Sequence, residues 1–160
     1  MKKECEEEIV RNKAEAYCVS VERCISEVKG KLKLWGATSA VSEKVIVRLL
    51  KDKFINEQRY AIAFVRDKYR FNGWGRVKIS MHLKKKGISD ELIERGLEEI
   101  DETEYLQNLK KLLQRKRKSV AGETDYERNG KLINFALNRG YEMNEILRLI
   151  KQPMQNDDMG

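Results

Sequence analysis

A repeat of about fifty residues constrains the fold of this chain more than any other feature of its sequence. Glycines that follow helical patterns recur at intervals of 51 and 53 residues, at Gly36, Gly87 and Gly140. Glycine tolerates the left-handed backbone conformation that commonly ends a helix. A small or aliphatic residue stands four positions before each glycine, at Leu32, Leu83 and Ala136. The spacing predicts three tandem units.

A second pattern, Tyr-x-x-x-apolar-x-basic, has the same period. It occurs once in each unit, beginning at Tyr17, Tyr60 and Tyr105. Units of this size bury too little apolar surface alone, so neighbouring units stack and share a core. We therefore predict an all-α fold, a tandem array of three three-helix repeats that forms an elongated, curved molecule. A single compact bundle with accidental periodicity is the alternative.

The predicted boundaries follow from the repeat. The first repeat spans residues 1–55 with an N-terminal extension, the second spans 56–100, the third spans 101–152, and a flexible tail covers 153–160. Before Gly36 we expect two helices with a break near residues 24–26, because Ser26 is a good N-cap residue. One long helix over this stretch also fits the apolar spacing.

The later helices are placed by capping residues and apolar spacing. We expect the third helix to begin at Ser42, the fourth to be capped by Asn56, and the sixth by Ser89. The fifth helix is predicted between Gly75 and Lys86. Its predicted apolar side chains are Val77, Ile79, Met81 and Leu83.

The charge of the chain favours a polyanionic partner. The formal net charge is +7, and the sequence pI is about 9.3. Residues 66–86 carry eight Lys or Arg against Asp67, and residues 110–118 carry six basic side chains and no acid. Residues 88–104, by contrast, carry eight acids against Arg95. Uncompensated cations at this density point to nucleic acid, or to a complex that contains it.

No residue pattern indicates catalysis, a metal or a membrane. The phosphate-loop, HExxH and GxSxG patterns are absent, and Cys5, Cys18 and Cys24 fit neither a metal clip nor a disulfide framework. We expect Cys18 and Cys24 to lie on helices with at least one buried, and His82 to lie at a surface. Without a long apolar run or a signal peptide, we expect a cytoplasmic, non-enzymatic protein without cofactors.

Residues 54–97 resemble the middle repeat of the bacterial regulatory protein RecX family. The resemblance begins with an apolar-Ile-Asx-acid-x-Arg-aromatic-Ala pattern at Phe54–Ala61 and continues through Phe64-Val65-Arg66. It includes a Gly-x-x-x-Ile helix that begins at Gly75, the Leu-x-x-Lys-Gly-Ile-Ser pattern at Leu83–Ser89 and an acidic closing helix. Asn56 stands where the family usually has Asp. Trp74 occupies a position that is usually basic or small.

The resemblance implies a modulator of RecA that acts in homologous recombination, DNA repair and the SOS response. Proteins of this family bind the groove of the RecA–single-stranded DNA filament and inhibit its extension, ATP hydrolysis, strand exchange and co-protease activity. The implied partners are therefore the RecA filament and single-stranded DNA, contacted by a monomer. A basic helical nucleic-acid-binding protein that acts independently of RecA remains the alternative.

The candidate contact residues are basic side chains spread over the repeats, together with one tryptophan in a glycine-flanked hinge. Aromatic rings among cations can stack on bases or pack on a protein partner. The candidates are Arg59, Arg66, Arg70, Trp74, Arg76, Lys78, Lys84, Lys85, Lys86, Lys111, Arg115 and Arg117. No residue is predicted to be catalytic or to bind a metal.

Overall fold

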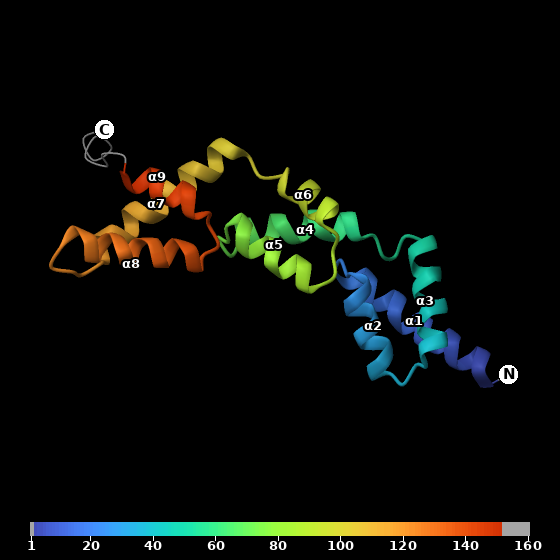
Figure 1. The fold of residues 1–160 in the computed structure, drawn as a ribbon. Helices are drawn as coiled ribbons and strands as arrows, with labels where there is room; N and C mark the ends of the chain where they lie inside the picture. The colour runs from blue at the N-terminus through green and yellow to red at the C-terminus, as the bar shows by residue number, and fades with distance from the viewer. Residues whose placement is uncertain (1, 152–160) are drawn as a thin grey trace. The chain divides into compact units, whose positions relative to one another are not determined.

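The computed structural model describes residues 2–151, with side chains from residue 6 onward. The described part is helical and contains no strand (Figure 1). The helices are α1 (Lys2–Ser20), α2 (Ile25–Leu34), α3 (Ser39–Lys51), α4 (Glu57–Arg70), α5 (Arg76–Lys85), α6 (Asp90–Leu97), α7 (Glu102–Ser119), α8 (Asp125–Asn138) and α9 (Met143–Lys151). The predicted tail at 153–160 and the side chain of Cys5 lie outside the described residues.

The three repeat glycines occupy the same place, between the second and third helix of each repeat. Their φ angles are +83° at Gly36, +85° at Gly87 and +96° at Gly140. The residue after each glycine donates its N–H to the carbonyl five positions back, on Leu32, Leu83 and Ala136 respectively, at 3.0–3.1 Å. This pattern is a Schellman motif, which requires a left-handed residue. The sequence repeat is therefore a repeat of helix ends, as predicted.

Two predicted helix starts are wrong by a few residues. The break before α2 lies at residues 21–24, and the residue that precedes the helix is Cys24, whose N–H donates to the Glu27 carboxylate at 3.1 Å. The Ser26 hydroxyl donates instead to the Lys86 carbonyl at 2.7 Å. Helix α3 begins three residues before Ser42, because the Thr38 hydroxyl accepts from the Val41 N–H at 3.2 Å.

The other predicted caps are confirmed. The Asn56 side chain accepts from the Arg59 N–H at 3.0 Å, and the Ser89 hydroxyl accepts from the Leu92 N–H at 3.3 Å. In α5 only half of the predicted apolar set is buried: Ile79 and Leu83 are inaccessible, whereas Val77 and Met81 are 43% and 54% exposed. Residues two apart lie on different faces of a helix, so the four cannot share one face.

The chain divides into two compact units. Unit 1 contains Met1–Phe64 and His82–Gly96, and unit 2 contains Val65–Met81 and Leu97–Gly160. The divisions fall inside α4 and α5 and before the last residue of α6, so each unit holds one terminal repeat and part of the second repeat.

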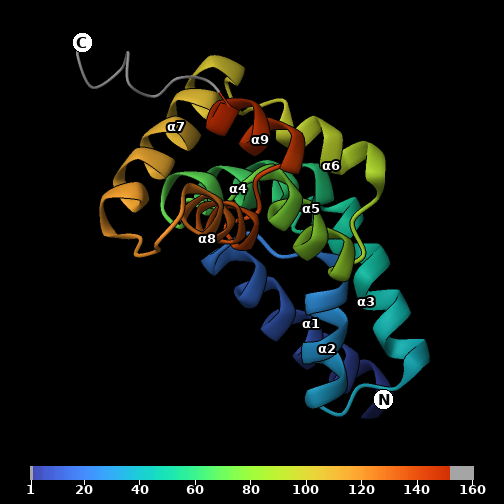
Figure 2. The same cartoon turned by 60° about the vertical axis from the view of Figure 1, so that its left-hand side comes forward.

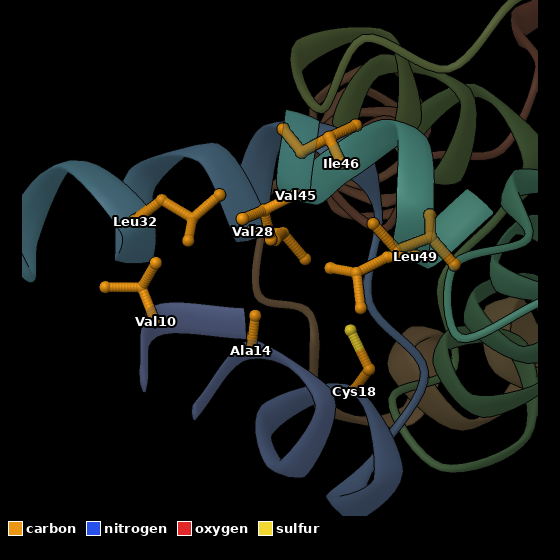
Figure 3. Packing of buried hydrophobic residues seen from close by; sticks show 9 residues of the cluster. Val10, Ala14, Cys18, Val28, Leu32, Val45, Ile46 and Leu49 are labelled. Carbon is orange, nitrogen blue, oxygen red and sulfur yellow. The ribbon is translucent and has the colours of Figure 1, made fainter. Parts of the chain in front are cut away.

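The core of unit 1 is built where α1, α2 and α3 meet. Figure 3 shows Val10, Ala14 and Cys18 of α1 pointing toward side chains of α2 and α3. The partners in the view are Val28, Leu32, Val45, Ile46 and Leu49. Burial raises the pKa of both the Cys18 and Cys24 thiols. The prediction that at least one of the two is buried is confirmed, but Cys24 precedes α2 and does not lie on a helix as expected.

The core of unit 2 is organised around Tyr105 of α7, whose side chain is inaccessible. Its ring contacts those of Tyr69 on α4 and Tyr141 after α8, with centroid separations of 6.1 and 5.0 Å. Fully buried aliphatic side chains from α5 and from the third repeat complete this core: Ile79, Leu109, Leu113, Leu132 and Ile146. Unit 2 therefore packs the third repeat on the half of the second repeat that it contains.

Candidate nucleic-acid interface

The exposed cations of unit 2 lie mainly on α4 and α7. Arg66 and Arg70 are one turn apart on α4, and Lys111 and Arg115 are one turn apart on α7. All four side chains are exposed, and none forms an ion pair with a described carboxylate. Arg117 is also exposed and donates to the Asn129 side chain at 3.5 Å. These side chains are sterically available to a polyanion.

A small cavity beside Arg66 and Arg70 carries both signs of charge. It has a volume of about 200 Å³, and carboxylates of the acidic block line it together with the two arginines. Tyr69 also lines this cavity; its hydroxyl lies 3.4 Å from Glu104 and accepts from Asn108 at 2.7 Å. Burial, and then the charge of Glu104, raises the pKa of Tyr69 to about 12. This cavity does not offer a phosphate a purely cationic lining.

In unit 1 two of the four candidate side chains are used internally. The Arg59 guanidinium pairs with Glu22 at 2.5 Å and donates to the Lys53 carbonyl at 3.0 Å. The Lys86 ammonium lies 3.3 Å from Glu27. Lys84 makes only an exposed pair with Asp90 at 3.6 Å, and Lys85 is exposed. Lys84 and Lys85 are therefore the more available pair.

Arg76 is held inside unit 2 by three neighbours. Its guanidinium contacts Glu102 at 2.9 Å and Glu142 at 3.0 Å, although Nε makes no hydrogen bond. The same group lies over the Tyr105 ring, 4.0 Å from its centroid. The Tyr105 hydroxyl donates to Glu142 at 2.5 Å and accepts from the Arg76 N–H at 3.0 Å. Arg76 therefore ties α5 to the third repeat.

Trp74 is partly buried between two lysines. The Lys68 and Lys78 ammonium groups lie 4.9 and 4.5 Å from the indole centroid. The backbone N–H of Trp74 donates to the Lys68 carbonyl at 3.0 Å. Cations over a ring face are attracted by its quadrupole. The indole therefore has one ammonium group from α4 and one from α5 close to its ring.

Sequence reasoning missed a similar arrangement around Phe135 of α8. The Lys116 ammonium and the Arg139 guanidinium lie 4.7 and 5.2 Å from the ring centroid. The sequence pattern predicts Phe135 to be a core residue, because its neighbours in the sequence are apolar. The i, i+4 spacing of Phe135 and Arg139 was the available signal for a shared helix face.

The acidic block at residues 88–104 mostly supports the fold. Asp101 caps α7 by accepting from the Glu104 N–H at 2.9 Å, and Glu102 pairs with Arg76. Asp90 and Glu91 pair with Lys84 and Arg95. Two of these contacts, of Glu102 with Arg76 and of Asp90 with Lys84, join the acidic block to the basic stretch before it.

The described residues contain no group of three or more His, Cys, Asp or Glu side chains that could hold a metal ion. None of the described helices is long and apolar enough to cross a bilayer.

The geometry defines an all-helical repeat protein that carries exposed cations on both units. Two family models match: the second three-helix domain of RecX over residues 56–97 and the third three-helix domain of RecX over residues 102–150. A regulatory protein RecX from Clostridium botulinum is 32% identical over 145 residues, which are 88% of this chain and 68% of that protein. The chain belongs to the RecX family, and relatives from two Clostridium species are named regulatory proteins.

Other relatives are longer than the part this chain matches. A regulatory protein RecX from Clostridium acetobutylicum is 32% identical over 79% of this chain and 60% of its own length. One from Bacillus mycoides is 28% identical over 78% of this chain and 46% of its own length. The chain therefore spans about half of some of the relatives it matches.

Solved structures confirm the fold. The crystal structure of RecX from Lactobacillus salivarius has a TM-score of 0.82 at 22% identity and covers 97% of this chain and 98% of its own. A second crystal structure, of a regulatory protein RecX, has a TM-score of 0.83 at 20% identity and covers 92% of this chain and 72% of its own. The prediction of an all-α fold with three-helix repeats is confirmed.

Proposed function

We propose that this protein regulates RecA by binding the RecA–single-stranded DNA filament. Binding inhibits filament extension, ATP hydrolysis, strand exchange and co-protease activity. Membership of a family of regulatory proteins supports a regulatory role. The observation that carries the proposal is the set of exposed cations on both units, represented by Lys84 and Lys85 in unit 1 and by Lys111 and Arg115 in unit 2.

The physical argument rests on what these cations neutralise. Single-stranded DNA inside a protein filament is a polyanion with condensed counterions, and each phosphate contact releases some of them. Cations on one short helix would suit a helix docked in a groove. Cations carried by several helices suit a ligand that is itself extended, such as a nucleoprotein filament.

The direct test is the DNA-dependent ATP hydrolysis of RecA from the same organism. The wild-type protein is added below the concentration of RecA, and we expect inhibition that weakens as salt rises. In the variant Lys111→Gln with Arg115→Gln, the concentration for half-inhibition should rise about tenfold, which corresponds to about 0.7 kcal/mol for each lost contact. Thermal unfolding should stay nearly unchanged, because neither side chain has an internal ion pair.

The matched control is Lys29→Gln with Lys33→Gln. These two lysines are exposed and one turn apart on α2, and they lie outside the candidate set. This variant removes the same charge but should inhibit like wild type. Equal loss in both variants would mean that net charge alone matters. Absence of inhibition by the wild-type protein, with retained nucleic-acid binding, would favour a helical nucleic-acid-binding protein that acts independently of RecA.

A further inference from the structure

We infer that unit 2 carries a binding site for single-stranded nucleic acid, built from two aromatic rings with a pair of cations on each. We call this set the cation–aromatic surface; its residues are Lys68, Trp74, Lys78, Lys116, Phe135 and Arg139. The inference rests on the proposed function for its biological meaning, and it names the part of this chain that contacts nucleic acid. Four of the six residues are not among the candidate contact residues predicted from the sequence.

The indole half of the surface is held by two helices and the loop between them. Lys68 comes from α4 and Lys78 from α5, and Trp74 lies in the loop that joins these helices. The ammonium groups lie within 5 Å of the indole centroid, at 4.9 and 4.5 Å. The ring is partly exposed, so an incoming planar group can reach it once an ammonium group moves aside.

The phenyl half comes from the third repeat. Phe135 and Arg139 lie one turn apart on α8 and at its end, and Lys116 reaches the same ring from α7. All three side chains are partly exposed. The phenyl ring therefore also has two cations near it, one from α7 and one from the end of α8.

Arg139 connects the two halves. Its carbonyl accepts from the Gly75 N–H at 2.7 Å, and its guanidinium lies 3.5 Å from the position that a Cβ on Gly73 would occupy. Gly73 and Gly75 flank Trp74, so the backbone contact fixes α8 beside the indole loop. Figures 1 and 2 both show the end of α8 against the start of α5. The six side chains thus belong to one packed arrangement.

Three of the four cations of the surface have no carboxylate partner among the described residues. No described carboxylate forms an ion pair with Lys78, Lys116 or Arg139. By contrast, Arg76, the first residue of α5, is paired with both Glu102 and Glu142. Lys78, Lys116 and Arg139 can therefore exchange a weak ring contact for an external anion.

This combination matches the chemistry of an unpaired nucleotide strand. Bases offer flat faces that stack on aromatic side chains, and the phosphates between them bind cations. In a duplex the bases already stack on one another and cannot reach the rings. An acidic protein surface could pair with the cations, but it would leave the two ring faces without stacking partners. The arrangement therefore favours single strands.

The test uses Trp74 as its own reporter. The chain has two tryptophans, so Trp35→Phe leaves Trp74 as the single source of tryptophan emission in the full chain. Adding oligothymidylate of about 16 nucleotides, the upper range for one such site, should quench this emission. The logarithm of affinity should fall with the logarithm of salt at a slope of about −2.8, for four phosphate contacts at about −0.7 each. Oligouridylate should quench as well.

Matched variants separate stacking from charge. Phe135→Leu keeps an apolar side chain but removes the ring, and affinity should fall about tenfold. Lys116→Gln should reduce the salt slope by about 0.7. Lys118→Gln removes an equal charge from an exposed residue of α7 that is outside the surface, and it should leave the salt slope of the site intact. Thermal unfolding is measured for each variant. Each titration is then repeated without the Trp35→Phe change, and binding is followed by the fluorescence anisotropy of a labelled oligonucleotide.

Four outcomes would overturn the inference. These are the absence of Trp74 quenching, equal affinity for an abasic strand of the same length, equal affinity for a duplex, and displacement of the strand by polyglutamate at equal charge. A fifth is loss of stability in Phe135→Leu with unchanged binding, which would make the ring contacts structural. None of these measurements contains RecA. Failure of the RecA assay with intact quenching would reject the proposed function and leave this site standing.

Discussion

Gly36 and Gly140 have similar backbone conformations in different surroundings. At Gly36 a Cβ would meet no atom within 4 Å. At Gly140 it would lie 2.3 Å from the Cβ of Lys78 and 2.8 Å from the Lys78 nitrogen. Position 36 requires glycine because of its positive φ angle alone. Position 140 requires glycine for the same reason and also because α5 approaches it closely. Sequence inspection cannot separate these reasons.

The pair gives a prediction at the residue scale. Gly36→Ala should lower the free energy of unfolding by about 1–2 kcal/mol, the cost of a left-handed alanine. Gly140→Ala should lower it by clearly more, because backbone and side-chain atoms of Lys78 must shift as well. Chemical denaturation of both variants measures the difference. Equal losses at the two positions would show that the contact with Lys78 relaxes without cost.

Arg76 and Lys84 lie on the same helix but contribute differently to stability. Arg76→Gln breaks two ion pairs and the contact with the Tyr105 ring, so we expect a loss of about 1–3 kcal/mol. Lys84→Gln breaks one exposed pair with Asp90 and should change stability by less than about 0.5 kcal/mol. Urea titration compares the two variants. If Arg76→Gln were as stable as wild type, Arg76 would become available as a binding residue.

At the scale of elements, most of the helices can be predicted from the sequence, because capping residues and glycines near a helix end determine where the helix stops or starts. The repeat glycines and the caps at Asn56 and Ser89 were predicted correctly, since each works through backbone geometry within a few residues. The start of α3 was wrong because Thr38 and Ser42 are both good N-cap residues. In the structure the Thr38 hydroxyl accepts from the Val41 N–H, so the helix begins at Ser39.

The corrected cap of α3 can be checked directly. Thr38→Ala removes the acceptor for the Val41 N–H and should cost about 1 kcal/mol of stability. Ser42→Ala changes a residue inside the helix and should be neutral or slightly stabilising, because alanine has the better helix propensity. Thermal unfolding of the two variants distinguishes the two starts. A larger loss in Ser42→Ala would restore the start expected from the sequence.

The candidate site was less predictable than the fold. The charge blocks correctly indicated where cations accumulate, but they could not show which cations the protein uses itself. Arg59, Arg76 and Lys86 are engaged by Glu22, Glu102 and Glu27, which lie 26 to 59 residues away in the sequence. Likewise, Phe135 is recognisable as part of a surface only after α7 and α8 are packed together. Such contacts depend on tertiary structure, for which one sequence has no local signal.

At the scale of the whole molecule, the division into two units predicts that a destabilising substitution in one unit lowers amide protection in that unit only. A Cβ on Gly75 would lie 2.4 Å from the backbone of Gly140, inside unit 2. In Gly75→Ala we therefore expect amides of α7–α9 to exchange faster with solvent deuterium, while those of α1–α3 keep their protection. Hydrogen exchange followed by mass spectrometry resolves the helices. Uniform loss of protection would show that the units unfold as one.

The hydrogen bonds that the Lys86 and Arg139 carbonyls accept bear on how such chains can gain or lose repeats during evolution. Each ends the second helix of one repeat and accepts a hydrogen bond at the start of the second helix of the repeat before it, from Ser26 and from Gly75. The second repeat thus carries both halves of the connector, the Gly75 N–H at one end of its second helix and the Lys86 carbonyl at the other. Gene duplication of one repeat would create a working connector without a new contact, so members of such a family can differ by whole repeats.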